Sequence, residues 1–292
     1  AITISPNNYV PYKNKGDILA KLGRNKEALE AYDCAINARP EHPDAYDLKG
    51  DVYFVLKEYG KALECYDRAW EIKPNSFEFL KDKGLALFKL EEYGQAIEYF
   101  DKALIIKPEQ NKILEIRIDA LLKLEEIDEL KKGIAFYDAG KYDDAIQYLN
   151  KSLGVNPNNA QTLYYRGLVL AILSQYDEAI LSYDKALKID PIYDEVTKAK
   201  ESVVEEQRQK KISSLIDEGL RCSKNSDYQN AIDLFDKAIK LNPQNYVPYY
   251  EKGGIKFKLE EYDEALECYD NAVQIKPDYC YAWYNKGEVF SK

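Results

Sequence analysis

The side chains that most often carry out chemistry are few in this sequence and do not gather into motifs. Its 292 residues contain one histidine, His42, which lies between Pro40 and Pro43. No two cysteines have the short spacing of a metal or redox pair, and the five are Cys34, Cys65, Cys222, Cys268 and Cys280. Catalysis needs convergent acid, base, nucleophile or metal groups. The sequence therefore predicts no catalytic residue, no metal site, no cofactor and no enzymatic activity.

Composition and charge narrow the classes of partner. The 41 Lys and Arg residues against 51 Asp and Glu residues give a formal net charge of −10. No basic block is present that could hold a phosphate backbone, and no stretch approaches the roughly 18 apolar residues of a membrane span. An odd number of cysteines without a framework indicates a reducing compartment. We therefore expect a cytoplasmic protein that binds neither nucleic acid nor membranes.

A period of 34 residues runs through the chain. Glycine recurs at Gly16, Gly50 and Gly84. Proline, alanine and aromatic residues return with the same spacing, at Pro40, Pro74 and Pro108, at Ala28, Ala62 and Ala96, and at Tyr32, Tyr66 and Phe100. A fixed period of this length is typical of a solenoid built from stacked supersecondary units.

Each period is interpreted as two helices of about 13 residues joined by a short turn. With residue 9 as position 1, glycine occupies position 8 and alanine position 20. We expect these two residues to face each other, because only small side chains let two helix backbones come close. Proline at position 32 ends the second helix, since it would cost a hydrogen bond inside one. The pattern predicts an all-α solenoid of antiparallel helix pairs.

This pattern resembles the tetratricopeptide repeat (TPR) family. Seven full matches occur, at 9–42, 43–76, 77–110, 126–159, 160–193, 212–245 and 246–279. The resemblance implies a right-handed TPR superhelix that acts as a non-catalytic protein–protein interaction scaffold, with the first helix of each pair lining a concave groove. In the family, such a groove takes a peptide or helix of a partner protein. The lysine and asparagine pattern of the clamp for acidic chaperone tails is absent, because Asp17, Asp51 and Leu85 stand at its key positions.

Two segments break the period, which predicts two register slips. The segment 111–125 reads as a first helix followed by a turn at Leu124–Glu129, and 194–211 reads as an extra helix or as an extension of the next helix. The predicted division is 1–8 (the end of a preceding repeat), 9–125 (three repeats plus an extra helix), 126–193 (two repeats), 194–211, and 212–292 (two repeats and a half repeat). Both ends fall inside a repeat, so we expect a fragment of a longer protein.

The character of the positions expected to face the groove changes along the chain. Early repeats place charged residues there, among them Lys13, Asp17, Lys21, Asp47 and Asp51. Later repeats place apolar residues there, and exposed apolar patches often mark interaction sites. The predicted partner-binding residues are Ile127, Ile134, Tyr137, Tyr164, Leu168, Ile172, Ile216 and Leu220. The alternative is that 194–211, with Val196, Ala199 and Val203 on one side, covers this patch.

Two other functions stay open at this point. The chain also fits a regulatory or substrate-docking region of a larger enzyme. It also fits a self-assembling array, because apolar residues are expected at both ends: Tyr12 and Leu19 at one, Trp283 and Phe290 at the other. Head-to-tail contact between such ends would be heterologous and could propagate, so weak end-to-end association is expected.

Overall fold

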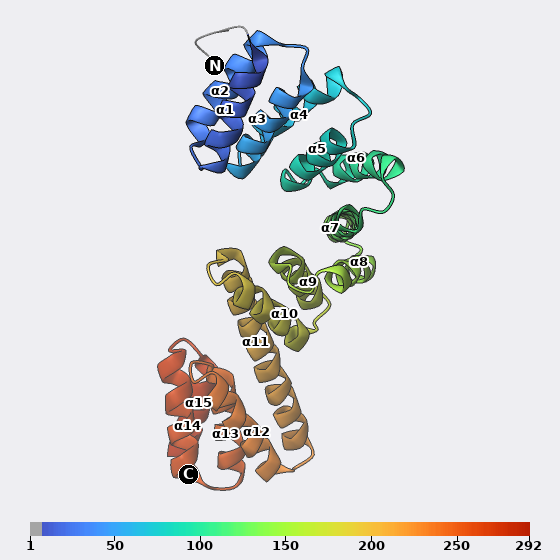
Figure 1. Ribbon diagram of the computed structural model, residues 1–292. Helices are drawn as coiled ribbons and strands as arrows, with labels where there is room; N and C mark the ends of the chain where they lie inside the picture. The colour runs from blue at the N-terminus through green and yellow to red at the C-terminus, as the bar shows by residue number, and fades with distance from the viewer. Residues whose placement is uncertain (1–7) are drawn as a thin grey trace. The chain divides into compact units, whose positions relative to one another are not determined.

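The computed structural model describes residues 8–292, and every regular element in that range is an α-helix (Figure 1). The predicted repeat remnant at 1–8 therefore lies, apart from Asn8, outside the described residues. The chain divides into two compact units, Ala1–Pro157 and Asn158–Lys292, and each is described by itself.

In the first unit the helices are α1 (Tyr9–Lys21), α2 (Asn25–Ala38), α3 (Pro43–Val55), α4 (Tyr59–Ile72), α5 (Phe77–Lys89), α6 (Tyr93–Ile106), α7 (Asn111–Asp138) and α8 (Tyr142–Val155). In the second unit they are α9 (Ala160–Ile172), α10 (Tyr176–Ile189), α11 (Asp194–Lys224), α12 (Tyr228–Leu241), α13 (Tyr246–Lys258), α14 (Tyr262–Ile275) and α15 (Cys280–Phe290). Neighbouring helices pack in antiparallel pairs, which confirms the predicted fold class.

A three-residue turn joins the two helices of each pair. In the third pair the Leu90 N–H donates to the Ala86 carbonyl at 3.0 Å, and the Glu92 N–H donates to the Leu87 carbonyl at 3.0 Å. These bonds satisfy carbonyls that a helix end otherwise leaves without partners. Between them, Glu91 has a φ of 63°. The equivalent residue of every such turn lies in this left-handed region, and only Gly23 and Gly140 are glycines.

The core of each pair is a glycine against a large side chain 16 residues later. A Cβ on Gly84 would lie 2.6 Å from a ring carbon of Phe100, and one on Gly167 would lie 2.3 Å from Tyr183. The alanine at position 20 was expected to face this glycine. The closest side-chain atoms belong instead to the residue at position 24, whose larger side chain reaches the bare backbone of the glycine. The alanine, such as Ala96, is fully buried beside it.

The long helices α7 and α11 interrupt the regular pairs. The turn predicted at Leu124–Glu129 is wrong, because α7 continues through it as one helix of 28 residues. The turn at Leu90–Glu92 also lacks glycine and proline, but the rings of Phe88 and Tyr93 pack against each other across it, and the corresponding residues of α7 are Leu122 and Ile127. α11 runs for 31 residues through 194–211 into the first helix of the next pair. The five-part division of the chain stays a prediction.

Among the described residues, ion pairs link six of the second helices, all except α8, to the first helix that follows each of them. Asp33 binds Lys49 at 2.6 Å, and Asp236 binds Lys252 at 2.7 Å. Four further pairs with the same 16-residue separation are Asp67–Lys83, Asp101–Arg117, Asp184–Lys200 and Asp270–Lys286. The sequence analysis missed these pairs, although the regular acid-to-base spacing was there to be found.

Candidate functional site

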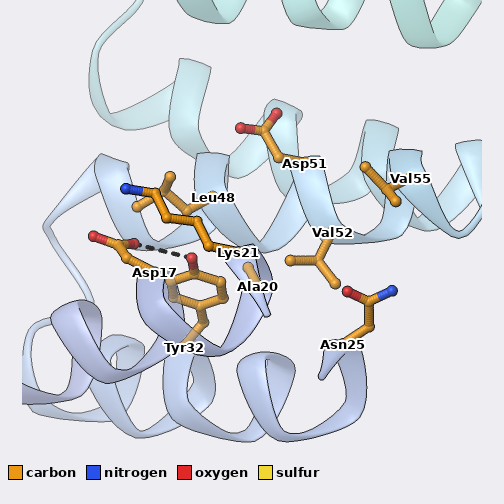
Figure 2. Close-up of a pocket in the computed structure, with 9 residues that line it drawn as sticks. All are labelled: Asp17, Ala20, Lys21, Asn25, Tyr32, Leu48, Asp51, Val52 and Val55. Atoms are coloured by element: carbon orange, nitrogen blue, oxygen red, sulfur yellow. Dashed lines mark hydrogen bonds between the residues drawn. The ribbon is translucent and has the colours of Figure 1, made fainter. Parts of the chain in front are cut away.

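A cavity of about 360 Å³ opens between α1 and α3, the first helices of two neighbouring pairs (Figure 2). Its apolar lining comes from Ala20, Leu48, Val52 and Val55. Its polar lining includes the carboxylates of Asp17 on α1 and Asp51 on α3, together with Lys21. The cavity therefore offers both hydrocarbon contact and negative charge to a single ligand group.

Asp17 is held in place by two donors. The Tyr32 hydroxyl, on α2, donates to Asp17 Oδ1 at 3.0 Å, as the dashed line in Figure 2 shows. Lys13 Nζ, one turn earlier on α1, lies 2.8 Å from Asp17 Oδ2. The Asp17 carboxylate is therefore fixed in direction, and Lys13 already balances its charge.

Asp51 and Asp47 lie one turn apart on α3 and have fewer partners. Asp51 Oδ1 accepts a hydrogen bond from the Tyr66 hydroxyl at 2.9 Å, and burial raises the pKa of the Asp51 carboxyl. Asp47 Oδ1 is buried and has no hydrogen-bond partner among the described residues. Burial, and next the charge of Asp51, raise the pKa of Asp47 to about 8. This part of α3 therefore carries carboxyl groups that lack a bound cation.

A further carboxylate lies on α5 beside this pair. Burial raises the pKa of Asp82 to about 6, against the opposing charge of Lys81, whose Nζ lies 3.1 Å from Asp82 Oδ1. The same ammonium group also binds Glu78 at 2.9 Å. The charge of Lys81 also opposes the rise in the pKa of Asp47 and of Asp51, although its ion pairs are with Glu78 and Asp82. Four carboxyl groups on α3 and α5 therefore share this one ammonium group.

The structure places the eight predicted binding residues on three helices in the two units. Ile127, Ile134 and Tyr137 lie on α7 of the first unit, whereas Tyr164, Leu168 and Ile172 lie on α9, and Ile216 and Leu220 on α11, of the second. Seven of the eight are partly buried. Ile172 is the exposed one, at 47%.

Packing within helix pairs accounts for part of this burial. Ile216 and Leu220 pack against a core cluster of α12 that contains Ala231 and Phe235. The centroid of the Tyr164 ring lies 6.4 Å from that of Tyr183, on α10 of the same pair. These contacts show that apolar side chains at such positions contribute to packing within the helix pairs.

The alternative prediction, that 194–211 covers the apolar patch, named apolar residues on one side of this segment, and two of them are buried in the structure. Val196 is 0% exposed and Val203 is 6% exposed. Nearby, the Tyr176 hydroxyl donates to Glu206 Oε1 at 2.8 Å, and Gln207 donates to Asp177 at 2.7 Å. The first half of α11 is therefore fixed to α10, and whether it also covers Leu168 and Ile172 stays a prediction.

One of the two apolar ends expected from the sequence differs in the structure. Leu19 is buried against Ala28, Tyr32 and Val52, so its predicted exposure is wrong, because α1 is fully paired with α2. At the other end, Trp283 is 51% exposed and Phe290 is 71% exposed, as predicted.

Residues 8–292 contain no group of three or more His, Cys, Asp or Glu side chains that could hold a metal ion. Burial raises the pKa of Cys65 and of Cys268 to about 11, so both thiols stay protonated at neutral pH. None of the described helices has the length and apolar run that crossing a membrane requires.

Comparison with protein families gives matches along most of the chain. Models described as tetratricopeptide repeat match residues 13–77 and 130–192, residues 77–110, and residues 219–245. A model described as TPR repeat matches residues 253–292. The chain belongs to the tetratricopeptide repeat family.

Solved structures similar to the chain include three with TPR in their names. YrrB, a TPR protein with an unusual peptide-binding site, is 22% identical; the match covers 68% of this chain and 95% of YrrB, with a TM-score of 0.37. The P58(IPK) TPR domain is 16% identical over 97% of this chain and 98% of that domain, with a TM-score of 0.43. The first TPR of Spaghetti (RPAP3), bound to an HSP90 peptide, is 22% identical over 40% of this chain and 92% of that domain, with a TM-score of 0.39. Comparison with curated protein sequences gave no match.

Proposed function

We propose that this chain is a non-catalytic interaction scaffold and that the first-helix face of α1, α3 and α5 binds a segment of a partner protein through a lysine or arginine side chain. The observation that carries this proposal is the pair Asp47 and Asp51 beside the α1–α3 cavity. Asp47 Oδ1 is buried without a hydrogen-bond partner among the described residues, and Asp51 has only the Tyr66 hydroxyl. A cation supplied by the partner would satisfy both.

The cavity suits the two parts of a basic side chain. Lysine and arginine have a hydrocarbon stem that packs on apolar surface and a charged end that needs anionic partners. Ala20, Val52 and Val55 would contact the stem, while Asp51 would receive the charged end. Hydrogen bonds in which one group is charged are about twice as strong as neutral ones.

The acid–base state of this face supports the same class of ligand. A carboxyl group with a pKa of about 8, such as that of Asp47, is largely protonated at neutral pH. An incoming cation would favour the charged form and release the proton. Binding is therefore expected to strengthen as the pH rises from 6 to 8, with proton release on complex formation.

The apolar positions of the second unit are proposed as a separate contact region. Leu168 and Ile172 lie one turn apart on α9, and Ile172 is the most exposed of the eight predicted residues. Substitution of both residues by aspartate distinguishes a role in partner binding from a role in core packing. Loss of partner binding with unchanged unfolding supports a binding role, and loss of cooperative unfolding assigns them to the core.

A peptide-library selection tests the proposed ligand class. Random 12-residue peptides displayed on phage are selected against the wild-type chain and against the Asp51→Asn variant. The control variant is Asp33→Asn, which removes an acid that already binds Lys49 on another face of the first unit. We expect lysine or arginine to be enriched with the wild type and with Asp33→Asn, and to be lost with Asp51→Asn. Enrichment of acidic peptides, or equal selection by all three proteins, would refute the proposal.

A further inference from the structure

The first half of α7 carries a stripe of aliphatic side chains that remains exposed to solvent. Leu114, Ile118, Leu121 and Leu122 are between 37% and 50% exposed. On the opposite side of the same turns, Ile113 is buried in the core cluster of α5 and α6. The first half of α7 therefore packs into the core with one side, and its other side is apolar as well but exposed.

The stripe exists because α8 covers only the second half of α7. The Ser152 hydroxyl, near the end of α8, donates to the Glu126 carbonyl at 3.2 Å, and Asn156, just beyond it, donates to Glu126 Oε1 at 2.8 Å. Residues 111–125 of α7 extend beyond that point, over about 22 Å at 1.5 Å per residue. The stripe thus continues the surface on which α8 packs.

The first half of α11 can be compared with the first half of α7, because it too stands at the place of a first helix and has no second helix of its own. The positions that correspond to Leu114, Ile118, Leu121 and Leu122 are occupied on α11 by Thr197, Glu201, Val204 and Glu205. All four are exposed. The fold therefore tolerates polar residues at these positions. The aliphatic residues of the stripe on α7 are not needed for the helix to form.

The side chain at the glycine position limits what can occupy the stripe. In the seven regular pairs a Cβ at that position would lie 2.3 to 2.8 Å from a side chain of the second helix. Ile118 stands at this position on α7, so a second helix of the repeat type cannot approach as closely. Helices that meet through branched aliphatic side chains keep their axes 8–10 Å apart.

The charge around the stripe defines its partner further. The exposed carboxylates of Glu115, Asp119 and Glu125 border the stripe and form no ion pair with a described residue. A partner with basic side chains on its flank would complement them.

We propose that residues 111–125 of α7 dock a short amphipathic helix of a partner protein, with an aliphatic face and with lysine or arginine on its flank. This surface lies on a different part of the first unit from the α1–α3 cavity. Its use does not depend on the function proposed above, because the cavity and the stripe share no residue.

Two synthetic 14-residue peptides provide the probes. Both carry leucine at every third or fourth position, and one has lysine on its flanks where the other has glutamate. Fluorescence anisotropy of each labelled peptide is measured against the full chain and against Ile118→Asp. The control variant is Val204→Asp, at the corresponding unpaired segment of α11, where the side chain is 40% exposed.

We expect the lysine peptide to bind the wild type and Val204→Asp equally, and to bind Ile118→Asp at least about tenfold more weakly, a loss of roughly 1.4 kcal/mol. The glutamate peptide is expected to bind the wild type at least about tenfold more weakly than the lysine peptide. Circular dichroism should show the same unfolding midpoint for all three proteins. No binding to the wild type, equal binding to Ile118→Asp, or no preference between the peptides would overturn the proposal. A wild-type dimer in sedimentation that Ile118→Asp dissolves would also overturn it, since the occupant would then be a second copy.

Discussion

The Tyr66 hydroxyl donates a hydrogen bond to Asp51 Oδ1 at 2.9 Å, and so joins the core of its helix pair to the face that we propose binds a partner. Tyr32 and Asp17 make the same contact in the preceding pair at 3.0 Å. Where the core ring is Phe100 or Phe235 and has no hydroxyl, the position of the aspartate is taken by Leu85 or Leu220. In the first three pairs the polarity of this face is therefore linked to the ring buried behind it, whereas Leu168 and Gly254 take the aspartate position in the pairs of Tyr183 and Tyr269.

The first prediction concerns this link. Tyr66→Phe removes the donor while keeping the ring that packs on Gly50, so the free energy of unfolding at pH 7 should fall by about 1–2 kcal/mol. The pKa of Asp51 should rise further, because the Tyr66 hydrogen bond lowers it. Urea denaturation and NMR titration of the carboxyl carbon measure the two effects. Tyr281→Phe, at a residue 63% exposed, is the control. An unchanged Asp51 titration would show that the hydrogen bond has no electrostatic role.

The second prediction concerns pH. The pKa of Asp47 is about 8 in the folded chain, against about 3.9 in an unfolded one. The folded state therefore holds this proton more tightly, and the contribution of Asp47 to stability is lost as the pH rises from about 4 to about 8. Asp47→Asn should be more stable than the wild type at pH 8.5 by about 1 kcal/mol or more. The difference should shrink toward pH 5. A difference that grows on acidification would contradict the assigned pKa shift.

The third prediction compares two glycines of one helix pair. Gly84→Ala would place a Cβ 2.6 Å from a ring carbon of Phe100, and overpacking of this kind costs about 1–3 kcal/mol. Gly94→Ala, on the second helix of the same pair, meets nothing within 4 Å and should stabilise the helix by up to about 1 kcal/mol. Thermal unfolding of both variants tests this. Similar effects for both would mean that the close approach at Gly84 is absent.

The fourth prediction uses the left-handed turn residues. Glu91 has a φ of 63°, a conformation that costs a side-chain-bearing residue roughly 1 kcal/mol. Glu91→Gly should therefore stabilise the chain by up to about 1 kcal/mol, and Gly140→Ala should destabilise it by a similar amount. Equilibrium urea denaturation measures both changes. Destabilisation by Glu91→Gly would show that the flexibility of glycine in the unfolded state outweighs the relief of strain.

The repeat spacing predicted most of the fold. The helix pairs follow from glycine, alanine, an aromatic ring and proline at fixed positions, because these residue types set close approach, packing and helix ends. The turn expected at Leu124–Glu129 failed because it was inferred from its likeness to the turn at Leu90. That likeness did not take into account that Leu122 and Ile127 stand where the Leu90 turn has the two contacting rings of Phe88 and Tyr93, and α7 passes straight through the segment.

The candidate site was predictable only in part. The charged residues of the early repeats could be assigned to one face from their repeat positions. Which of these carboxylates have a partner could not be predicted. Lys81 binds Glu78 and Asp82, while Asp47 Oδ1 has no hydrogen-bond partner among the described residues. Conversely, Ile216 and Leu220 looked like groove residues by position, but they pack against the core of their own helix pair.

The most direct test of the central claim is to locate a bound peptide on the first unit. A basic peptide selected on the wild type is synthesised with a photoreactive leucine analogue beside its lysine or arginine. It is then cross-linked to the full chain, and the attachment sites are mapped by mass spectrometry. We predict attachment to α1 and α3 around the cavity, at Ala20, Val52 or Val55, and its loss in Asp51→Asn. Attachment only to α4 and α6, or only to residues 158–292, would contradict the proposed binding face.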